Sequence, residues 1–307
     1  MTRFAAVRRF IVLTAVAVLY SGVQAQQQAQ LFLSVLDAQG APLKDLKAEE
    51  VVVTADGKDC KVLKVEPFSK PMRLTVMIDN GPITSKDLEG LRAAFKALIQ
   101  DVPEEIPIEL LTTAPQPRWL EKLTADRPKL LQAIDRLNRD TSPGSYFDAL
   151  VEAAARAEKD KADYFPVFVV LVADSRVDLS FQDFKYDKLQ KQILQRAITV
   201  HYILAQAAGA PRSIGPRADV GSAMAQLSGG QFETVSVTDD RPLTKLMPEL
   251  ARQIAKSDRR QTNQFRVTYE SPGKVTAGQQ VGASLRTTKA GLVPQLSFDG
   301  HMPQSKP

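Results

Sequence analysis

Two aspartates follow predicted strands at positions where side chains can bind a ligand. Asp79 follows the apolar run Leu74–Ile78, and Asp174 follows the apolar run Val167–Ala173. Near-continuous apolar runs of this length are typical of parallel strands covered on both faces. Ligands of open α/β sheets bind outside the carboxyl ends of the strands. The sequence therefore places both carboxylates where binding or chemistry is expected.

Ser145 is a third polar candidate, at the start of a predicted helix. Asp148 follows it three residues later, which is a capping-box arrangement. The two aspartates also have a purely structural interpretation, since carboxylates cap loops and helix starts well. The residues alone leave both interpretations open.

Residues 72–257 supply the elements that would position these groups. Short apolar runs alternate with segments whose apolar residues recur at helical spacing. This alternation predicts an α/β fold with a doubly wound, mostly parallel sheet flanked by helices. The predicted strands are 74–78, 108–112, 118–120, 167–173, 198–204 and 232–235, and the predicted helices centre on 88–98, 131–137, 147–154, 186–197, 220–227 and 243–254.

Both ends of the chain read as short strands. The N-terminal strands are 31–36, 51–54 and 60–65, with the hairpin signal Asp56-Gly57, and the C-terminal strands are 264–270, 281–288 and 292–298. Three strands are marginal alone, so we expect both sets to form one small all-β sandwich. The predicted divisions are a signal peptide (1–25), N-terminal strands (26–70), an α/β domain (71–258), C-terminal strands (259–300) and a tail (301–307).

The first 25 residues have the pattern of a signal peptide. Arg3, Arg8 and Arg9 precede the apolar run 10–19, and Val23-Gln24-Ala25 offers small residues for cleavage. We therefore expect export to the periplasm or the exterior, with Gln26 as the first mature residue. An uncleaved N-terminal anchor is the alternative. The rest of the sequence shows no candidate membrane span, so we expect no stable span after signal removal.

Composition argues against a nucleic-acid partner. The formal charge of +5 falls to +2 once the three signal-peptide arginines are removed, leaving 37 basic against 35 acidic residues. No basic run with interleaved aromatic residues is present. The single cysteine, Cys60, cannot form an internal disulfide, so it is either buried or pairs between chains.

The layout resembles bacterial exported proteins that carry a von Willebrand factor type A domain. Residues 35–46 are similar to the N-terminal strand and turn of that group, and residues 53–58 to its next hairpin. The family binds a divalent cation through Asp-x-Ser-x-Ser after the first strand, a Thr from a Gly-Thr loop, and an Asp after the fourth strand. By this resemblance Asp79, Ser145 and Asp174 occupy ligand positions of the metal site.

Two positions depart from the family pattern. Gly81 and Ile83 stand where the motif has its serines, and neither supplies a side-chain oxygen. Mg²⁺ requires octahedral oxygen ligands at about 2.0–2.1 Å. We therefore expect a vestigial site and no cofactor, with Mg²⁺ or Mn²⁺ binding as the alternative.

Signals for an enzyme are weak. His201 lies in an apolar strand, where a core histidine is expected, and His301 lies in the tail. The pentapeptide 227–231, Leu-Ser-Gly-Gly-Gln, matches the signature of ABC-transporter ATPases, but no phosphate-binding Gly-x-x-x-x-Gly-Lys-Ser/Thr accompanies it. Glycines that end a helix explain it. The prediction is that the protein is not an enzyme.

The predicted working surface is the end of the sheet where the strand-to-helix loops meet. Tyr146, Arg176 and Arg212 are the predicted protein contacts, because aromatic and arginine side chains are enriched at binding hot spots. Arg212 lies in the long loop 207–219. Two functions stay open: an adhesion or scaffold module that binds an unidentified protein without metal, and a structural component of a cell-envelope assembly.

Overall fold

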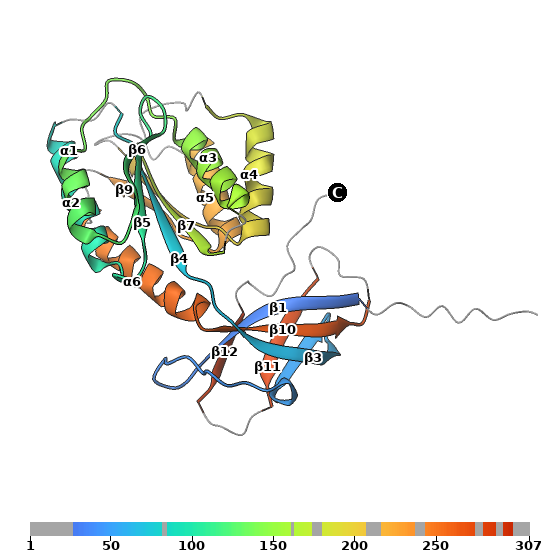
Figure 1. The fold of residues 1–307 in the computed structure, drawn as a ribbon. Coiled ribbons are helices and arrows are strands. Elements are labelled where there is room, and N and C mark those ends of the chain that lie inside the picture. Colours follow the sequence, from blue (N-terminus) through green and yellow to red (C-terminus); the bar gives the residue numbers. More distant parts are fainter. Residues whose placement is uncertain are drawn as a thin grey trace, which may run out of the picture.

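The computed structural model describes residues 27–81, 85–160, 163–173, 180–206, 216–236, 243–273, 279–286 and 291–296. Several predictions lie outside the described residues: the signal peptide, the tail, and the residues Ile83, Asp174, Arg176 and Arg212. Figure 1 shows a helix-flanked part above and an antiparallel β part below. Among the described helices, none is both long and apolar enough to cross a membrane.

The upper part is built on a mostly parallel six-stranded sheet. Its strands follow the order β6-β5-β4-β7-β8-β9, and all pair in parallel except β6, which runs antiparallel at one edge. Their bounds are β4 Met72–Ile78, β5 Ile108–Thr112, β6 Arg118–Thr124, β7 Phe165–Ala173, β8 Thr199–Gln206 and β9 Phe232–Ser236. The predicted parallel sheet is confirmed.

Helices cover both faces of this sheet (Figure 1). One face packs on α1 (Ser85–Asp101), α2 (Arg127–Asp135) and α6 (Leu243–Gln261), and the other on α3 (Tyr146–Lys159), α4 (Asp183–Arg196) and α5 (Pro216–Ser228). Strand β7 shows why: Val167, Val169 and Leu171 join the first core, while Phe168, Val170 and Val172 join the second. Side chains alternate across a strand, so an unbroken apolar run serves two cores.

The lower part combines the two ends of the chain, as predicted. Strand β1 pairs with β10 in antiparallel register, with Leu31 opposite Val267. The bounds are β1 Gln27–Leu36, η1 Ala48–Glu50, β2 Val51–Ala55, β3 Lys58–Phe68, β10 Gln264–Ser271, β11 Val281–Leu285 and β12 Val293–Leu296. The Asp56-Gly57 turn has φ values of 49° and 75°, the left-handed pair that a tight hairpin requires.

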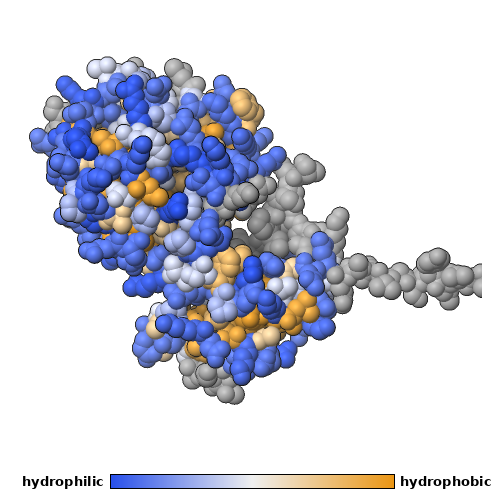
Figure 2. Space-filling view, in the orientation of Figure 1, coloured by the Kyte–Doolittle hydropathy of each residue, from blue (hydrophilic) through white to orange (hydrophobic). Residues whose placement is uncertain are grey.

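The lower part is not the two separate sheets that a sandwich implies. All six strands form one antiparallel sheet in the order β11-β2-β3-β10-β1-β12. The physical reason is the length of β3, whose start pairs with β2 and whose remainder pairs with β10. The edge strands β11 and β12 approach each other, so the sheet curls around its own apolar core. Figure 2 shows hydrophobic residues in patches on this part.

Candidate functional site

Asp79 lies at the carboxyl end of β4, as predicted, but its side chain is turned inward. The residue is 2% exposed. Its Oδ1 accepts hydrogen bonds from the Gly81 N–H at 3.1 Å and from the Thr113 hydroxyl at 3.4 Å. Its own N–H donates to the Leu171 carbonyl at 3.0 Å, which ties β4 to β7. The carboxylate therefore stabilises the loops around it.

The loop before α3 lies directly over this carboxylate. A Cβ on Gly144 would sit 2.4 Å from Asp79 Oδ1 and 2.6 Å from Thr113 Oγ1. A Cβ on Gly81 would sit 3.1 Å from the same carboxylate oxygen. All three distances are shorter than ordinary contacts, and the two at residue 144 are so short that only glycine allows this approach. The signal for this packing is the pair of glycines. From the sequence, Gly81 was considered only as a missing hydroxyl, and Gly144 was not considered.

Asn80 holds three neighbouring loops together. Its Nδ2 donates to the Asn138 carbonyl at 2.8 Å, and its Oδ1 accepts from the Ala114 N–H at 3.1 Å. Its backbone carbonyl accepts from the Asp140 N–H at 2.7 Å. At 7% exposure these bonds are shielded from water, where a hydrogen bond is worth more. Internal polar contacts thus fix the loops after β4, after β5 and before α3, which together form the loop cluster around Asp79.

Ser145 directly precedes α3, but its side chain does not cap the helix. Its N–H donates to the Thr113 carbonyl at 2.9 Å, and its hydroxyl donates to the Pro115 carbonyl at 3.0 Å. No side-chain cap bond forms, and Asp148 is instead ion-paired with Lys185 at 2.8 Å. The predicted capping box is therefore wrong, because both side chains bind outside the helix.

Tyr146 is a core residue, and its predicted role in direct partner contact is corrected. It is 1% exposed, and its ring meets the Tyr202 ring edge-on with centroids 5.8 Å apart. The physical reason is its helical position: Tyr146 lies four residues before Leu150, on the face of α3 that packs against the sheet. That spacing is visible in the sequence.

Asp140 is a partly exposed carboxylate at this end of the sheet that sequence analysis missed. The Ser142 N–H donates to its Oδ1 at 2.8 Å, and this bond lowers the pKa of Asp140 below its usual value. Asp followed two residues later by Ser is a turn signal that could have identified it.

The described residues at this end of the sheet do not by themselves supply an octahedral set of oxygen ligands. Asp79 Oδ1 already accepts two hydrogen bonds, the Ser145 hydroxyl is directed at a carbonyl, and Gly81 offers no side-chain oxygen. In the described ranges, no group of three or more His, Cys, Asp or Glu side chains could hold a metal ion. Asp174, the remaining predicted ligand, lies outside them.

Replacing Asp79 tests this interpretation. We expect Asp79→Ala to lower the free energy of unfolding by about 1–3 kcal/mol, since two buried donors lose their acceptor. Asp79→Asn keeps an acceptor oxygen and should lose less. Denaturant unfolding, followed in EDTA and in 5 mM Mg²⁺, checks both. A Mg²⁺-dependent gain in the wild type that Asp79→Asn abolishes would contradict the structural role.

The other reactive side chains lie away from this loop cluster. His201 is 5% exposed within β8, as predicted for a core histidine, and its Nδ1 accepts from the Gln231 N–H at 3.3 Å. Cys60 is half-buried against the core of the antiparallel sheet, and burial raises the pKa of its thiol.

Comparisons with known proteins give fold likeness only. No protein-family model and no curated protein sequence matches this chain. Similar solved structures include a von Willebrand factor type A protein from Catenulispora acidiphila, at 12% identity and a TM-score of 0.49, covering 92% of this chain and 74% of that one. The SpRpn10 VWA domain is similar at 15% identity and a TM-score of 0.45, and the match covers 62% of this chain and 97% of that one.

A conserved hypothetical protein, BatB from Bacteroides thetaiotaomicron, is also similar, at 10% identity and a TM-score of 0.45 over 61% of this chain and all of its own. At TM-scores below 0.5, these likenesses do not identify what the present chain binds.

Proposed function

We propose that this chain is an exported, non-catalytic module that binds a protein partner without metal. The observation that carries the proposal is that the Asp79 carboxylate is buried and hydrogen-bonded to the loops around it. A partner that completed a cation's coordination would need this carboxylate facing outward. The structural role of the carboxylate leaves the loops above it as the recognition surface.

Loop positions support the same surface. The loops that follow β4, β7 and β8 leave the same end of the sheet, because these strands are parallel. Such loops on a rigid sheet are common sites of binding. Asp140 is partly exposed there, and Arg176 and Arg212 belong to the loops after β7 and β8 by their place in the sequence. We propose these two arginines as the direct contacts.

Capture from the native envelope fraction tests the proposal. We expect Arg176→Ala/Arg212→Ala to weaken a captured partner's affinity at least tenfold, since arginine is a frequent hot-spot residue. EDTA should leave the affinity unchanged. Arg252→Ala/Arg259→Ala, which removes two exposed arginines from α6, is the matched control. Loss of binding in EDTA, with the double loop variant unaffected, would overturn the proposal.

A component of a cell-envelope assembly is the second candidate. Val293 on edge strand β12 is 49% exposed, and exposed apolar edges favour association. Oligomeric state separates the candidates: an adhesion or scaffold module should run as a monomer in light scattering, and an assembly component should self-associate or co-purify in a stable complex.

A further inference from the structure

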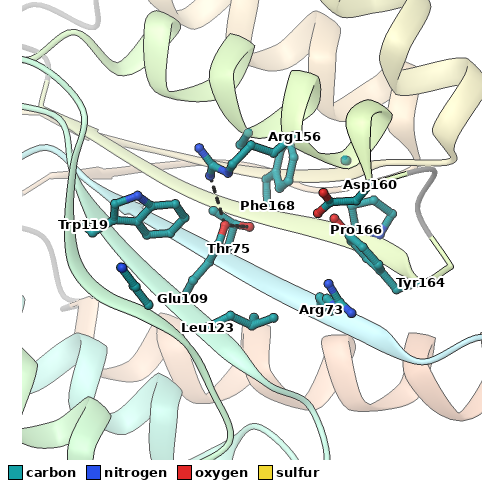
Figure 3. A pocket seen from close by; sticks show the side chains of 13 residues that line it. Arg73, Thr75, Glu109, Trp119, Leu123, Arg156, Asp160, Tyr164, Pro166 and Phe168 are labelled. Atoms are coloured by element: carbon teal, nitrogen blue, oxygen red, sulfur yellow. Dashed lines mark hydrogen bonds and ion pairs between the residues drawn. The ribbon is translucent and has the colours of Figure 1, made fainter.

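A pocket of about 290 Å³ opens on the side of the upper sheet, below α3. The core beneath α3, α4 and α5 contains no residue from β5 or β6, so the sheet surface beyond α3 is left partly uncovered. Figure 3 shows side chains from β4, β5, β6 and α3 converging on this hollow. It is distinct from the loop cluster around Asp79.

Each end of the pocket has an arginine stacked on an aromatic ring. The Arg156 guanidinium lies 4.4 Å from the Trp119 ring centroid, and the Arg73 guanidinium lies 4.0 Å from the Tyr164 ring centroid. Such cation–π contacts hold both partners in place. Figure 3 shows the two pairs on opposite sides of Glu109. In each pair the arginine and the ring therefore support one another in the pocket wall.

The negative charge of Glu109, which lies between these two pairs, is already balanced by an ion pair. Its Oε1 accepts from the Thr75 hydroxyl at 2.6 Å and pairs with Arg156 at 3.2 Å. Among the described residues, neither Arg73 nor Lys122 has a carboxylate within ion-pair distance. Asp160 is the other carboxylate of the lining. Among the described residues, two cations without an ion-pair partner thus face one carboxylate that also lacks one, and the pocket favours a negatively charged ligand.

Apolar surface accompanies this charge. Trp119 is 42% exposed and Leu123 is 38% exposed, and both come from edge strand β6. Both side chains also line the hollow, so they offer apolar surface on which a ligand's apolar groups can pack. Because β6 is an edge strand among the described strands, the pocket is reachable from the sheet edge by an extended chain.

We propose that this pocket docks an extended, acidic segment of a partner protein. Its carboxylates contact Lys122 and Arg73, and its apolar side chains pack on Trp119 and Leu123. The site would act beside the proposed loop surface and does not depend on it. The segment is negatively charged because its charge must complement the cations of the pocket.

Trp119 provides a direct readout, because it is the only tryptophan of the chain. The probe is a synthetic octapeptide of alternating valine and glutamate, titrated into the full mature protein while Trp119 emission is followed. We expect a saturable change at low salt, which the matched valine–lysine octapeptide does not produce. Lys122→Glu should weaken binding at least tenfold. Since Lys122 is exposed, the variant should fold normally.

Lys245→Glu makes the same charge change on α6, at the opposite face of the sheet, and should bind as the wild type does. Any of the following results would overturn the proposal: no saturable change with the acidic peptide, equal binding by Lys122→Glu, or equal responses to both peptides. An equal response to free glutamate at the same concentration would also overturn it, since a carboxylate alone would then suffice. None of these outcomes depends on Arg176 or Arg212.

Discussion

Gly230→Ala is expected to lower the free energy of unfolding by roughly 3 kcal/mol, the upper end of the usual range for overpacking. A Cβ at this position would lie 2.0 Å from the Val200 carbonyl oxygen and 2.5 Å from its carbon. Both are backbone atoms of a buried strand, so no side chain can move aside. Relief requires a shift of β8 or of the end of α5.

Equilibrium denaturation followed by circular dichroism measures this loss. Gly90→Ala is the matched control, because the new methyl group in α1 would meet no atom within 4 Å. Alanine in an exposed helix interior should raise stability by about 0.5–1 kcal/mol. If Gly230→Ala unfolds within 0.5 kcal/mol of the wild type, the close approach to β8 is refuted.

The same geometry explains the pentapeptide Leu227–Gln231. Gly229 has a φ of +69° and ends α5, while the Gly230 N–H donates to the Ala225 carbonyl at 2.9 Å. Glycine at a left-handed helix end is a common termination. The prediction that these glycines end a helix is confirmed. Gly230 has the further role of letting the loop pack on β8.

The fold was predictable from periodicity because burial on two faces leaves a distinct pattern. The run from Val167 to Ala173 is apolar throughout since alternate residues enter different cores. Strand pairing in the lower part was not predictable in the same way. A period-2 pattern does not say how many neighbours a strand has, and β3 pairs with two. One curled sheet and two stacked sheets therefore give similar sequences.

The candidate site was predictable in position but not in the direction of its side chains. The end of β4 follows from its apolar run, which places Asp79 correctly. Whether the carboxylate faces a ligand or its own loops depends on Thr113 and Gly144, which are 34 and 65 residues away. Tyr146 was accessible to helical spacing, because Leu150 and Ala153 share its face. Treating it as a loop residue hid that pattern.

Acid should destabilise the protein through His201, by about 3 kcal/mol between pH 6.5 and pH 4. Burial lowers the pKa of His201 from 6.5 to about 4, because the charged imidazolium is poorly solvated within β8. In that window the unfolded chain binds a proton that the folded chain does not. The contribution of neutral His201 to stability is therefore complete above pH 6.5, and it is lost as the pH falls to the folded pKa of about 4.

His201→Asn isolates this effect. The amide oxygen can still accept from the Gln231 N–H, but the side chain no longer titrates. We expect a lower stability at pH 7.5, from the lost ring volume, together with a flatter decline towards pH 4. Asp140 also loses stabilisation in acid because its folded pKa is lowered, but it is present in both proteins and cancels in the comparison. Denaturant unfolding at pH 7.5, 5.5 and 4.5 gives the two curves. Parallel curves would show that the His201 proton does not couple to folding, and the sheet would then have to solvate the imidazolium.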